Sequence, residues 1–147
     1  MKKILLLALF LALLLTACGG DGSGVSSEGI VEIPERFFVT QMESLRINAD
    51  DYVGRTLRYE GLFMTSFWDL TGEDAYLIYR YVWDCCGNDG QAGFIIDLGD
   101  IEPFPDNAWV EVTGVLEWFE VDEFRFLRVA AISIREMEER GTEVVMP

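Results

Sequence analysis

Two adjacent cysteines, Cys85 and Cys86, are the residues of this chain whose chemistry stands out first. They follow an apolar run and precede a turn signal in the segment YVWDCCGNDG, residues 81–90. A disulfide between them would be strained, because neighbouring Cα atoms lie about 3.8 Å apart and relaxed disulfides span about 4.4–6.8 Å. The pair is therefore unsuited to a stabilising crosslink, and three other roles remain open.

Metal binding is the first of these roles. Two thiolates suit Zn²⁺ or Cu⁺, and both sulfurs can reach one ion if the strand ends here, as the following GNDG indicates. Since the chain has no histidine, the remaining ligands would be water or nearby carboxylates. The candidate zinc site consists of Cys85, Cys86, Asp84 and Asp89.

Thiol redox chemistry and simple packing are the other two roles. A reversible dithiol can serve as a sensor in an oxidising compartment, but no histidine or lysine stands near it to lower a thiol pKa. Arg80 is the nearest cation in sequence. Alternatively, one cysteine fills the core as a small hydrophobic residue while its neighbour sits at the rim.

Exposed aromatic side chains offer a second kind of binding site. Trp118 and Phe119 are adjacent in an expected strand, so one of the two faces outward. Trp118 is our candidate for stacking on a sugar or a peptide.

Signatures of enzymes and of calcium sites are lacking. Without histidine, general-base chemistry would need paired carboxylates, and no pair stands out. The chain has no P-loop, no dinucleotide fingerprint and no nucleophile elbow, so we expect no enzyme. The acids of residues 97–106 match no EF-hand loop, and we expect a solvated connection there.

The N-terminus reads as a bacterial lipoprotein signal. Lys2 and Lys3 precede an apolar core, Ile4 to Leu15, which is too short to span a bilayer comfortably. The following LTAC motif resembles a lipobox, in which Cys18 is acylated, for instance with palmitate, and becomes the new N-terminus. We therefore expect a signal peptide over 1–17 and a lipid-anchored, flexible linker over 18–30.

Without the leader the chain is strongly acidic. Removing Lys2 and Lys3 leaves nine arginines against 26 acidic residues, a formal net charge of −17. Such a surface repels nucleic acid and anionic lipid headgroups. We therefore expect no nucleic-acid partner.

The remaining sequence predicts a small all-β domain. Five strand-like segments follow one another closely between residues 55 and 134, as in a closed or nearly closed barrel. Gly61 and Gly114 each follow an alternating run, which is typical of bulges or bends at barrel corners. We predict a five-stranded OB-like β-barrel over 31–136, with an open β-sandwich as the alternative.

The segments around that barrel are expected to be short. Residues 100–108 carry two prolines and leave no room for the helix that usually joins the third and fourth OB strands. Residues 37–39 predict a short strand or one helical turn, and 49–53 a single helical turn capped by Asn48. The C-terminal tail, 137–147, is expected to be a short helix or a frayed end.

Three segments give the chain a family resemblance. NADDYVGRTLRYEG, YVWDCCGNDGQAGF and WVEVTGVLEW occur in the order found in the C-terminal domain of YcgQ-type permease-associated bacterial membrane proteins. The resemblance covers roughly residues 48–132, and the Cys-Cys centre is its most specific part. It implies an association with a transport system, with zinc homeostasis as the suggested context. A lipid anchor here stands in place of their transmembrane helices.

These observations converge on a binding role at a membrane. We expect a lipid-anchored, extracytoplasmic, non-enzymatic accessory module that handles a thiophilic metal, zinc above all, or assists a permease or envelope protein. A thiol-redox protein using Cys85 and Cys86, and a ligand-binding lipoprotein using exposed aromatics such as Trp118, are the alternatives.

Overall fold

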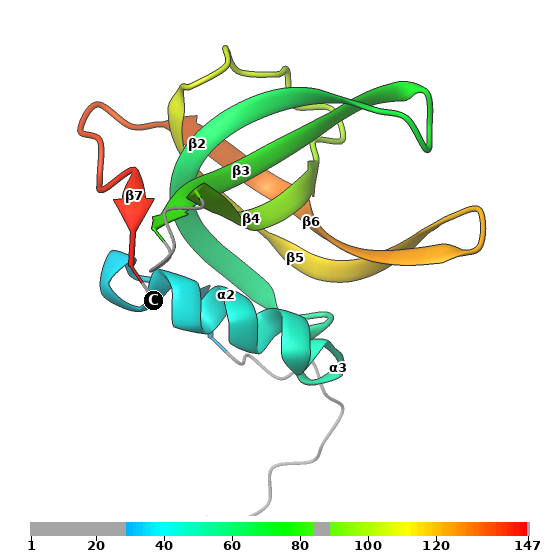
Figure 1. Ribbon diagram of the computed structural model, residues 1–147, viewed down its shortest axis with the longest axis horizontal. Helices are drawn as coiled ribbons and strands as arrows, with labels where there is room; N and C mark the ends of the chain where they lie inside the picture. The colour runs from blue at the N-terminus through cyan, green and yellow to red at the C-terminus, as the bar shows by residue number, and fades with distance from the viewer. Residues whose placement is uncertain (1–28, 84–88, 147) are drawn as a thin grey trace, which may run out of the picture.

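A computed structural model describes residues 29–83 and 89–146 of the chain. One seven-stranded sheet, two α-helices and a 3₁₀ turn make up the described part (Figure 1). In chain order the elements are β1 (Val31–Glu32), η1 (Glu35–Phe37), α2 (Phe38–Ile47), α3 (Ala49–Tyr52), β2 (Thr56–Trp68), β3 (Glu73–Trp83), β4 (Asp89–Asp97), β5 (Trp109–Val121), β6 (Phe124–Glu136) and β7 (Val144–Val145).

The five long strands close into an OB-like barrel. Strand β2 pairs antiparallel with β3 and with β5, β3 pairs with β4, and β5 pairs with β6. A short parallel pairing between β4 and β6 completes the ring. The order is that of a five-stranded Greek-key barrel, so the predicted barrel is confirmed and the open sandwich is not observed.

Glycine at two strand positions lets the barrel bend, as the sequence predicted. At Gly61 and Leu62, β2 changes from pairing with β5 to pairing with β3, and a Cβ on Gly61 would lie 2.6 Å from the Tyr79 carbonyl oxygen. The β5–β6 register shifts between Thr113 and Gly114. At Gly114 a Cβ would collide with the Ala130 carbonyl, so only glycine fits this bulge without displacing the neighbouring strand.

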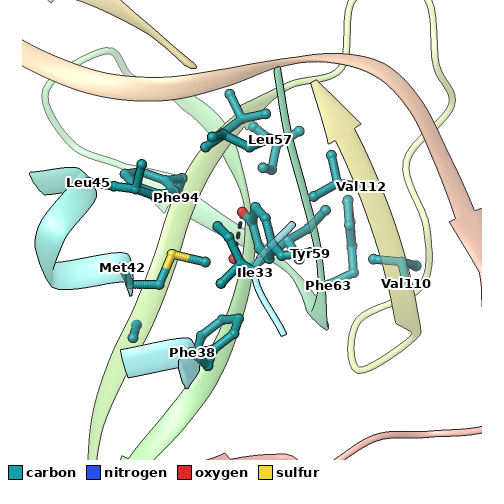
Figure 2. Packing of buried hydrophobic residues seen from close by; sticks show 14 of the residues in the cluster. Ile33, Phe38, Met42, Leu45, Leu57, Tyr59, Phe63, Phe94, Val110 and Val112 are labelled. Carbon is teal, nitrogen blue, oxygen red and sulfur yellow. Dashed lines mark hydrogen bonds between the residues drawn. The ribbon is translucent and has the colours of Figure 1, made fainter. Parts of the chain in front are cut away.

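Helix α2 covers one end of the barrel and completes the core (Figures 1 and 2). Its apolar side chains Phe38, Met42 and Leu45 are at most 2% exposed. They meet the barrel interior, where Tyr59 donates a hydrogen bond of 3.2 Å to the Ile78 carbonyl oxygen. Burying these side chains stabilises the fold by roughly 1.5–3 kcal/mol each.

Helix α2 is longer than the sequence predicted. Residues 37–39 were expected to form a strand or a single turn, but ten residues are helical from Phe38 onward. The N-cap position is Phe37, which makes no side-chain capping bond, so the usual start signal is missing. The spacing of Phe38, Met42 and Leu45 is nevertheless that of a buried helix face.

The other short segments follow the expectations more closely. Helix α3 is the predicted single turn, although the Asn48 side chain makes no capping bond and instead donates to Ser44 Oγ at 3.5 Å. Residues 98–108 form a helix-free connection. The tail differs, since Val144–Val145 pair in parallel with β3. No helix in the described ranges is long and apolar enough to cross a bilayer.

Candidate functional site

The cysteine pair belongs to residues 84–88, which stand in sequence between β3 and β4. Residues 84–88, with Asp84, Cys85 and Cys86, lie outside the described residues, and the side chain of Asp89 does also. The β3–β4 ladder closes with Trp83 opposite Asp89, and Trp83 is 58% exposed. In sequence, Asp84 and the two cysteines therefore stand between the last residue of β3 and the first residue of β4, Asp89. Cys18, the predicted lipidation site, also lies outside the described ranges.

Trp118 is engaged within the molecule. Its indole Nε1 donates a hydrogen bond of 3.1 Å to Asp50 on α3. The guanidinium of Arg125 lies over the ring, 4.2 Å from its centroid. The side chain is half-buried, and a ligand that stacks on it would have to share the ring with Arg125. The prediction that Trp118 binds a ligand remains a prediction.

Two hairpins, β2–β3 and β5–β6, project from the same side of the barrel (Figure 1). Residues of both hairpins line a cleft. Its volume is about 310 Å³. Its walls come from the end of β2, the start of β3, the end of β4 and the β5–β6 hairpin. Trp68, Tyr76, Phe119 and Arg128 are among the lining residues.

Aromatic rings join the two hairpins beside this cleft. The Trp68 ring centroid lies 5.8 Å from that of Phe119 and 5.0 Å from that of Phe126, edge to face in both cases. Phe124 continues the row at 6.4 Å from Phe126 and is 51% exposed. Edge-to-face pairs of this kind add about 0.5–1.5 kcal/mol each beyond their buried area, so the row fixes the spacing of the hairpins.

Charges in the cleft are unevenly compensated. Arg128 is held by Asp97 at 2.9 Å and by Glu117 at 2.7 Å, with its guanidinium 5.0 Å from the Phe119 ring centroid. Glu73 and Asp74 on β3 also line the cleft and are exposed. No salt bridge reaches either of them from any described residue. The cleft is therefore net acidic.

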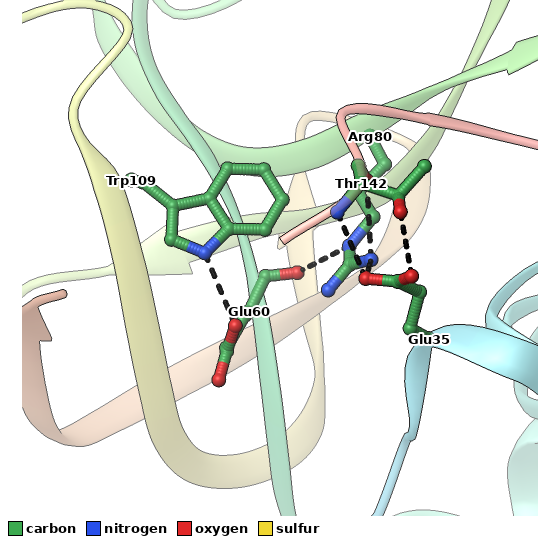
Figure 3. Close-up of polar contacts among 5 residues, drawn as sticks. All are labelled: Glu35, Glu60, Arg80, Trp109 and Thr142. Carbon is green, nitrogen blue, oxygen red and sulfur yellow. Dashed lines mark hydrogen bonds and ion pairs between the residues drawn. The ribbon is translucent and has the colours of Figure 1, made fainter. Parts of the chain in front are cut away.

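A second polar cluster lies around Arg80, which donates hydrogen bonds to internal partners through Nε and Nη1 (Figure 3). Arg80 is 2% exposed and lies between the rings of Phe38 and Trp109, at 4.7 and 4.8 Å from their centroids. Its guanidinium donates to the Glu60 carbonyl at 2.9 Å, to Glu35 Oε2 at 3.1 Å and to the Thr142 carbonyl at 3.2 Å. From the sequence, Arg80 is the cation nearest to the cysteines and an arginine expected to pair with a Glu, and in the structure Glu35 compensates its charge.

Glu35 extends this cluster to the C-terminal tail. Its carboxylate accepts hydrogen bonds from the backbone N–H of Thr142 at 2.8 Å and from the Thr142 hydroxyl at 2.5 Å. These bonds and the adjacent Arg80 hold the pKa of Glu35 below its usual range. The Arg80 pKa is lowered by burial. The cluster fastens the tail and the segment before α2 to the barrel, which is a structural task.

Two buried tyrosines have raised pKa values. Burial, with a hydrogen bond of 3.2 Å to the Tyr81 hydroxyl, raises the pKa of Tyr79 to about 12. Burial also raises the pKa of Tyr59. Both phenols stay protonated at neutral pH and serve as hydrogen-bonding core residues.

Carboxylates elsewhere do not gather into a cation site. Across residues 29–83 and 89–146, no group of three or more acidic, histidine or cysteine side chains is placed to hold a metal. In the connection that the sequence singled out, Asp97 pairs with Arg128. Asp106 accepts a hydrogen bond of 2.8 Å from the Thr65 backbone N–H.

The cleft was not predicted as a site from the sequence. Trp68 lies far in sequence from Phe119 and Phe126, which face each other in the β5–β6 hairpin, and only the barrel's curvature brings β2 against that hairpin. One signal was present: Phe124, Phe126 and Arg128 alternate along one strand, which places them on a common face.

Two solved structures and one family model are similar to this chain. The dimeric N-terminal domain of PriB from Thermoanaerobacter tencongensis is 19% identical, with 57% of this chain and 97% of that chain covered and a TM-score of 0.35. The small single-stranded DNA-binding protein from Streptomyces coelicolor is 19% identical, with 59% and 96% covered and a TM-score of 0.36. No curated protein sequence matches the chain. Residues 22–143 match the family described as the DUF1980 C-terminal domain, and the chain therefore belongs to that family.

Proposed function

We propose that this protein is a lipid-anchored, extracytoplasmic, non-enzymatic binding module whose ligand occupies the cleft between the β2–β3 and β5–β6 hairpins. One observation carries the proposal. The polar groups of the Arg80 cluster are paired internally, whereas Glu73 and Asp74 face an open cleft beside an ordered row of aromatic rings. A cleft with aromatic walls and a few polar groups is the usual form of a ligand site.

The anchor is the acylated Cys18. Its support is the order of the leader: two lysines, an apolar core, the LTAC motif and a Gly/Ser-rich linker. Acylation with several chains would hold the domain at the outer face of the membrane. The domain carries a strongly negative formal charge, so anionic headgroups would repel it. For the same reason we propose no nucleic-acid partner.

Labelling of an introduced cysteine tests location and occupancy together. Thr71→Cys places a thiol in the cleft wall, and Glu138→Cys places one on an exposed surface elsewhere. A membrane-impermeant maleimide should label both from outside in spheroplasts, with each site read separately by mass spectrometry. The cleft site should react more slowly in the membrane than in the purified protein, while Glu138→Cys reacts equally in both.

Three results would count against the proposal. Equal rates at Thr71→Cys in membrane and purified protein would mean that nothing occupies the cleft in the envelope. No labelling of either position in spheroplasts would contradict the outward orientation. Incorporation of alkyne-palmitate that survives Cys18→Ala would contradict the anchor.

Zinc handling at the β3–β4 turn is a second candidate function. In sequence, Asp84, Cys85 and Cys86 stand between Trp83, the last residue of β3, and Asp89, the first residue of β4. Two thiolates with carboxylates form a donor set that fits Zn²⁺. A permease or another envelope protein that exchanges zinc with this turn would be the partner.

Native mass spectrometry of the intact chain in detergent tests the metal. After exposure to zinc under reducing conditions, one ion per chain should be retained, and lost in both Cys85→Ser and Cys86→Ser. Cys18→Ser is the control and should keep the ion. A loss of two daltons on mild oxidation without metal would favour the thiol-redox alternative, and two inert thiols without metal would leave the turn structural.

A further inference from the structure

We propose that the ligand of this cleft is an extended, basic segment of a partner protein. The segment adds as a strand to the free edge of β3 and places lysine or arginine side chains against Glu73 and Asp74. This inference rests on the proposed function, because it names the class of partner for the same cleft. It follows from strand pairing, space and charge.

Both hairpins that border the cleft contain strand residues that are paired on one side only. In β3, Glu73–Ala75 pair with β2, whereas pairing with β4 starts at Tyr76. In β6, Phe124–Leu127 pair with β5, whereas pairing with β4 is confined to Arg128–Ala130. No other strand of the described part joins either segment. Such edges present unpaired N–H and C=O groups to which an extended peptide can add.

The cleft lies where an added strand would fit. Strand β4 ends at Asp97, and the chain then turns away through Gly99, which has a φ of 56°. Residues Glu73–Ala75 are therefore left beyond the last β4 partner, and the cleft of about 310 Å³ is lined by these residues and by the end of β4. A peptide that prolongs the line of β4 would pair with Glu73–Ala75.

The charge of the cleft selects a basic occupant. The cation in its wall, Arg128, is already paired with Asp97 and Glu117. Glu73 and Asp74 have no cationic partner among the described residues, so they are free to pair with an incoming cation. Trp68 adds a ring face to which a lysine or arginine is attracted.

The same charges disfavour three other occupants. A polynucleotide would bring phosphates against Glu73 and Asp74. A second copy of this chain carries the same acidic charge. The chain's own linker, residues 18–30, contains Asp21 and Glu28 but no cation. A basic segment from a different protein is the remaining polypeptide.

Fluorescence anisotropy with labelled peptides tests the proposal on the intact chain in detergent at about 0.15 M salt. The probe is a peptide of about ten residues that alternates lysine with valine and phenylalanine, as a half-buried strand does. One control replaces every lysine with glutamate. A second keeps the lysines but has proline at alternate apolar positions, which removes backbone donors. Only the first peptide should bind with saturation.

Matched charge variants locate the binding. Glu73→Lys with Asp74→Lys should weaken binding by about tenfold or more, because like charges then meet in the cleft. Glu138→Lys with Glu139→Lys changes the total charge equally on an exposed segment outside the cleft and should have less than about a twofold effect. Trp68→Ala should weaken binding without changing the charge.

Three results would overturn the proposal. Equal weakening by the two double variants would reduce the binding to general attraction by an acidic protein. Equal binding of the proline peptide would exclude strand addition. No binding of the lysine peptide would reject a basic strand as the ligand. If the Thr71→Cys site is nevertheless protected in membranes, the cleft has a ligand of another class, and only the present inference fails.

Discussion

The two ends of this barrel treat polar and aromatic groups in opposite ways. At the end covered by α2, Phe38 and Trp109 are 1% exposed and enclose Arg80, whose Nε and Nη1 donate hydrogen bonds to internal acceptors. At the cleft, Trp68 is only half-buried, and the carboxylates of Glu73 and Asp74 have no cationic partner in the described part of the chain. The residue types are similar at both ends. The ends differ in how many of their polar side chains have hydrogen-bond or ion-pair partners within the protein.

This contrast separates stability from binding. Buried, paired groups contribute to folding, and leaving one partner without the other is costly. Exposed polar groups without partners inside the protein contribute little to folding, so they can bind a ligand at little cost in stability. Substitutions at the closed end should therefore reduce the free energy of unfolding, and substitutions at the cleft should reduce binding.

The largest expected effect compares two tryptophans. Trp109→Ala should lower the free energy of unfolding by about 3–5 kcal/mol, because it leaves a cavity in a closely packed core. Trp68→Ala should cost about 2 kcal/mol, since it removes two edge-to-face contacts at a half-buried site. Chemical denaturation of both variants measures the difference, and similar costs would erase the distinction between the two ends.

Two arginine–glutamate pairs give the next comparison. Arg80→Met should cost about 3 kcal/mol, since buried carbonyl oxygens lose their donor. Arg135 is bonded to Glu111 at 2.8 Å but is 66% exposed, and Arg135→Met should cost less than about 1 kcal/mol. Equal losses in denaturant titrations would contradict the structural role given to the Arg80 cluster.

The bulge at Gly114 should be sensitive to one methyl group. Gly114→Ala should cost about 2 kcal/mol, because the Cβ meets the rigid backbone of Ala130. The matched control is Gly90→Ala, whose Cβ would lie 3.9 Å from the nearest atom, Val82 Cβ. That control should stay within about 0.5 kcal/mol of the parent in thermal unfolding. A tolerant Gly114 would mean that β5 and β6 can separate at the bulge.

The smallest expected effect is a pH dependence at Glu35. Its pKa is lowered from 4.5 in the folded state, so its contribution to stability is present above that value and is lost as pH falls through the folded-state pKa. Glu35→Gln should flatten this part of the stability curve below about pH 4.5 and leave the slope near neutrality unchanged. An unchanged acid slope in the variant would show that Thr142 and Arg80 do not favour the ionised carboxylate.

The sequence predicted the barrel better than the surfaces that surround it. Alternation in β2 and β5, with Gly61 and Gly114 at the bends, follows from local patterns and was sufficient to predict the fold. At the start of helix α2 only a short strand or one helical turn was predicted, because Phe37 provides no capping signal and the run of Phe37, Phe38 and Val39 resembles a strand.

The candidate site was less predictable for a physical reason. Trp68 meets Phe119 and Phe126 only because β2 bends after Gly61. The cleft therefore could not be predicted from any local sequence pattern. Trp118 was singled out because adjacent strand residues face opposite ways, but α3 and Arg125 already contact it. The cysteine pair is visible in the sequence, and its residues lie outside the described ranges.

Hydrogen exchange of the intact chain, with and without the lysine–valine–phenylalanine peptide, tests the central claim most directly. The account predicts slower exchange of backbone amides in Glu73–Ala75 when the peptide is bound, with no change in Phe38–Ile47. Protection of Phe38–Ile47, or weak protection spread over the whole surface, would contradict a binding site in the cleft.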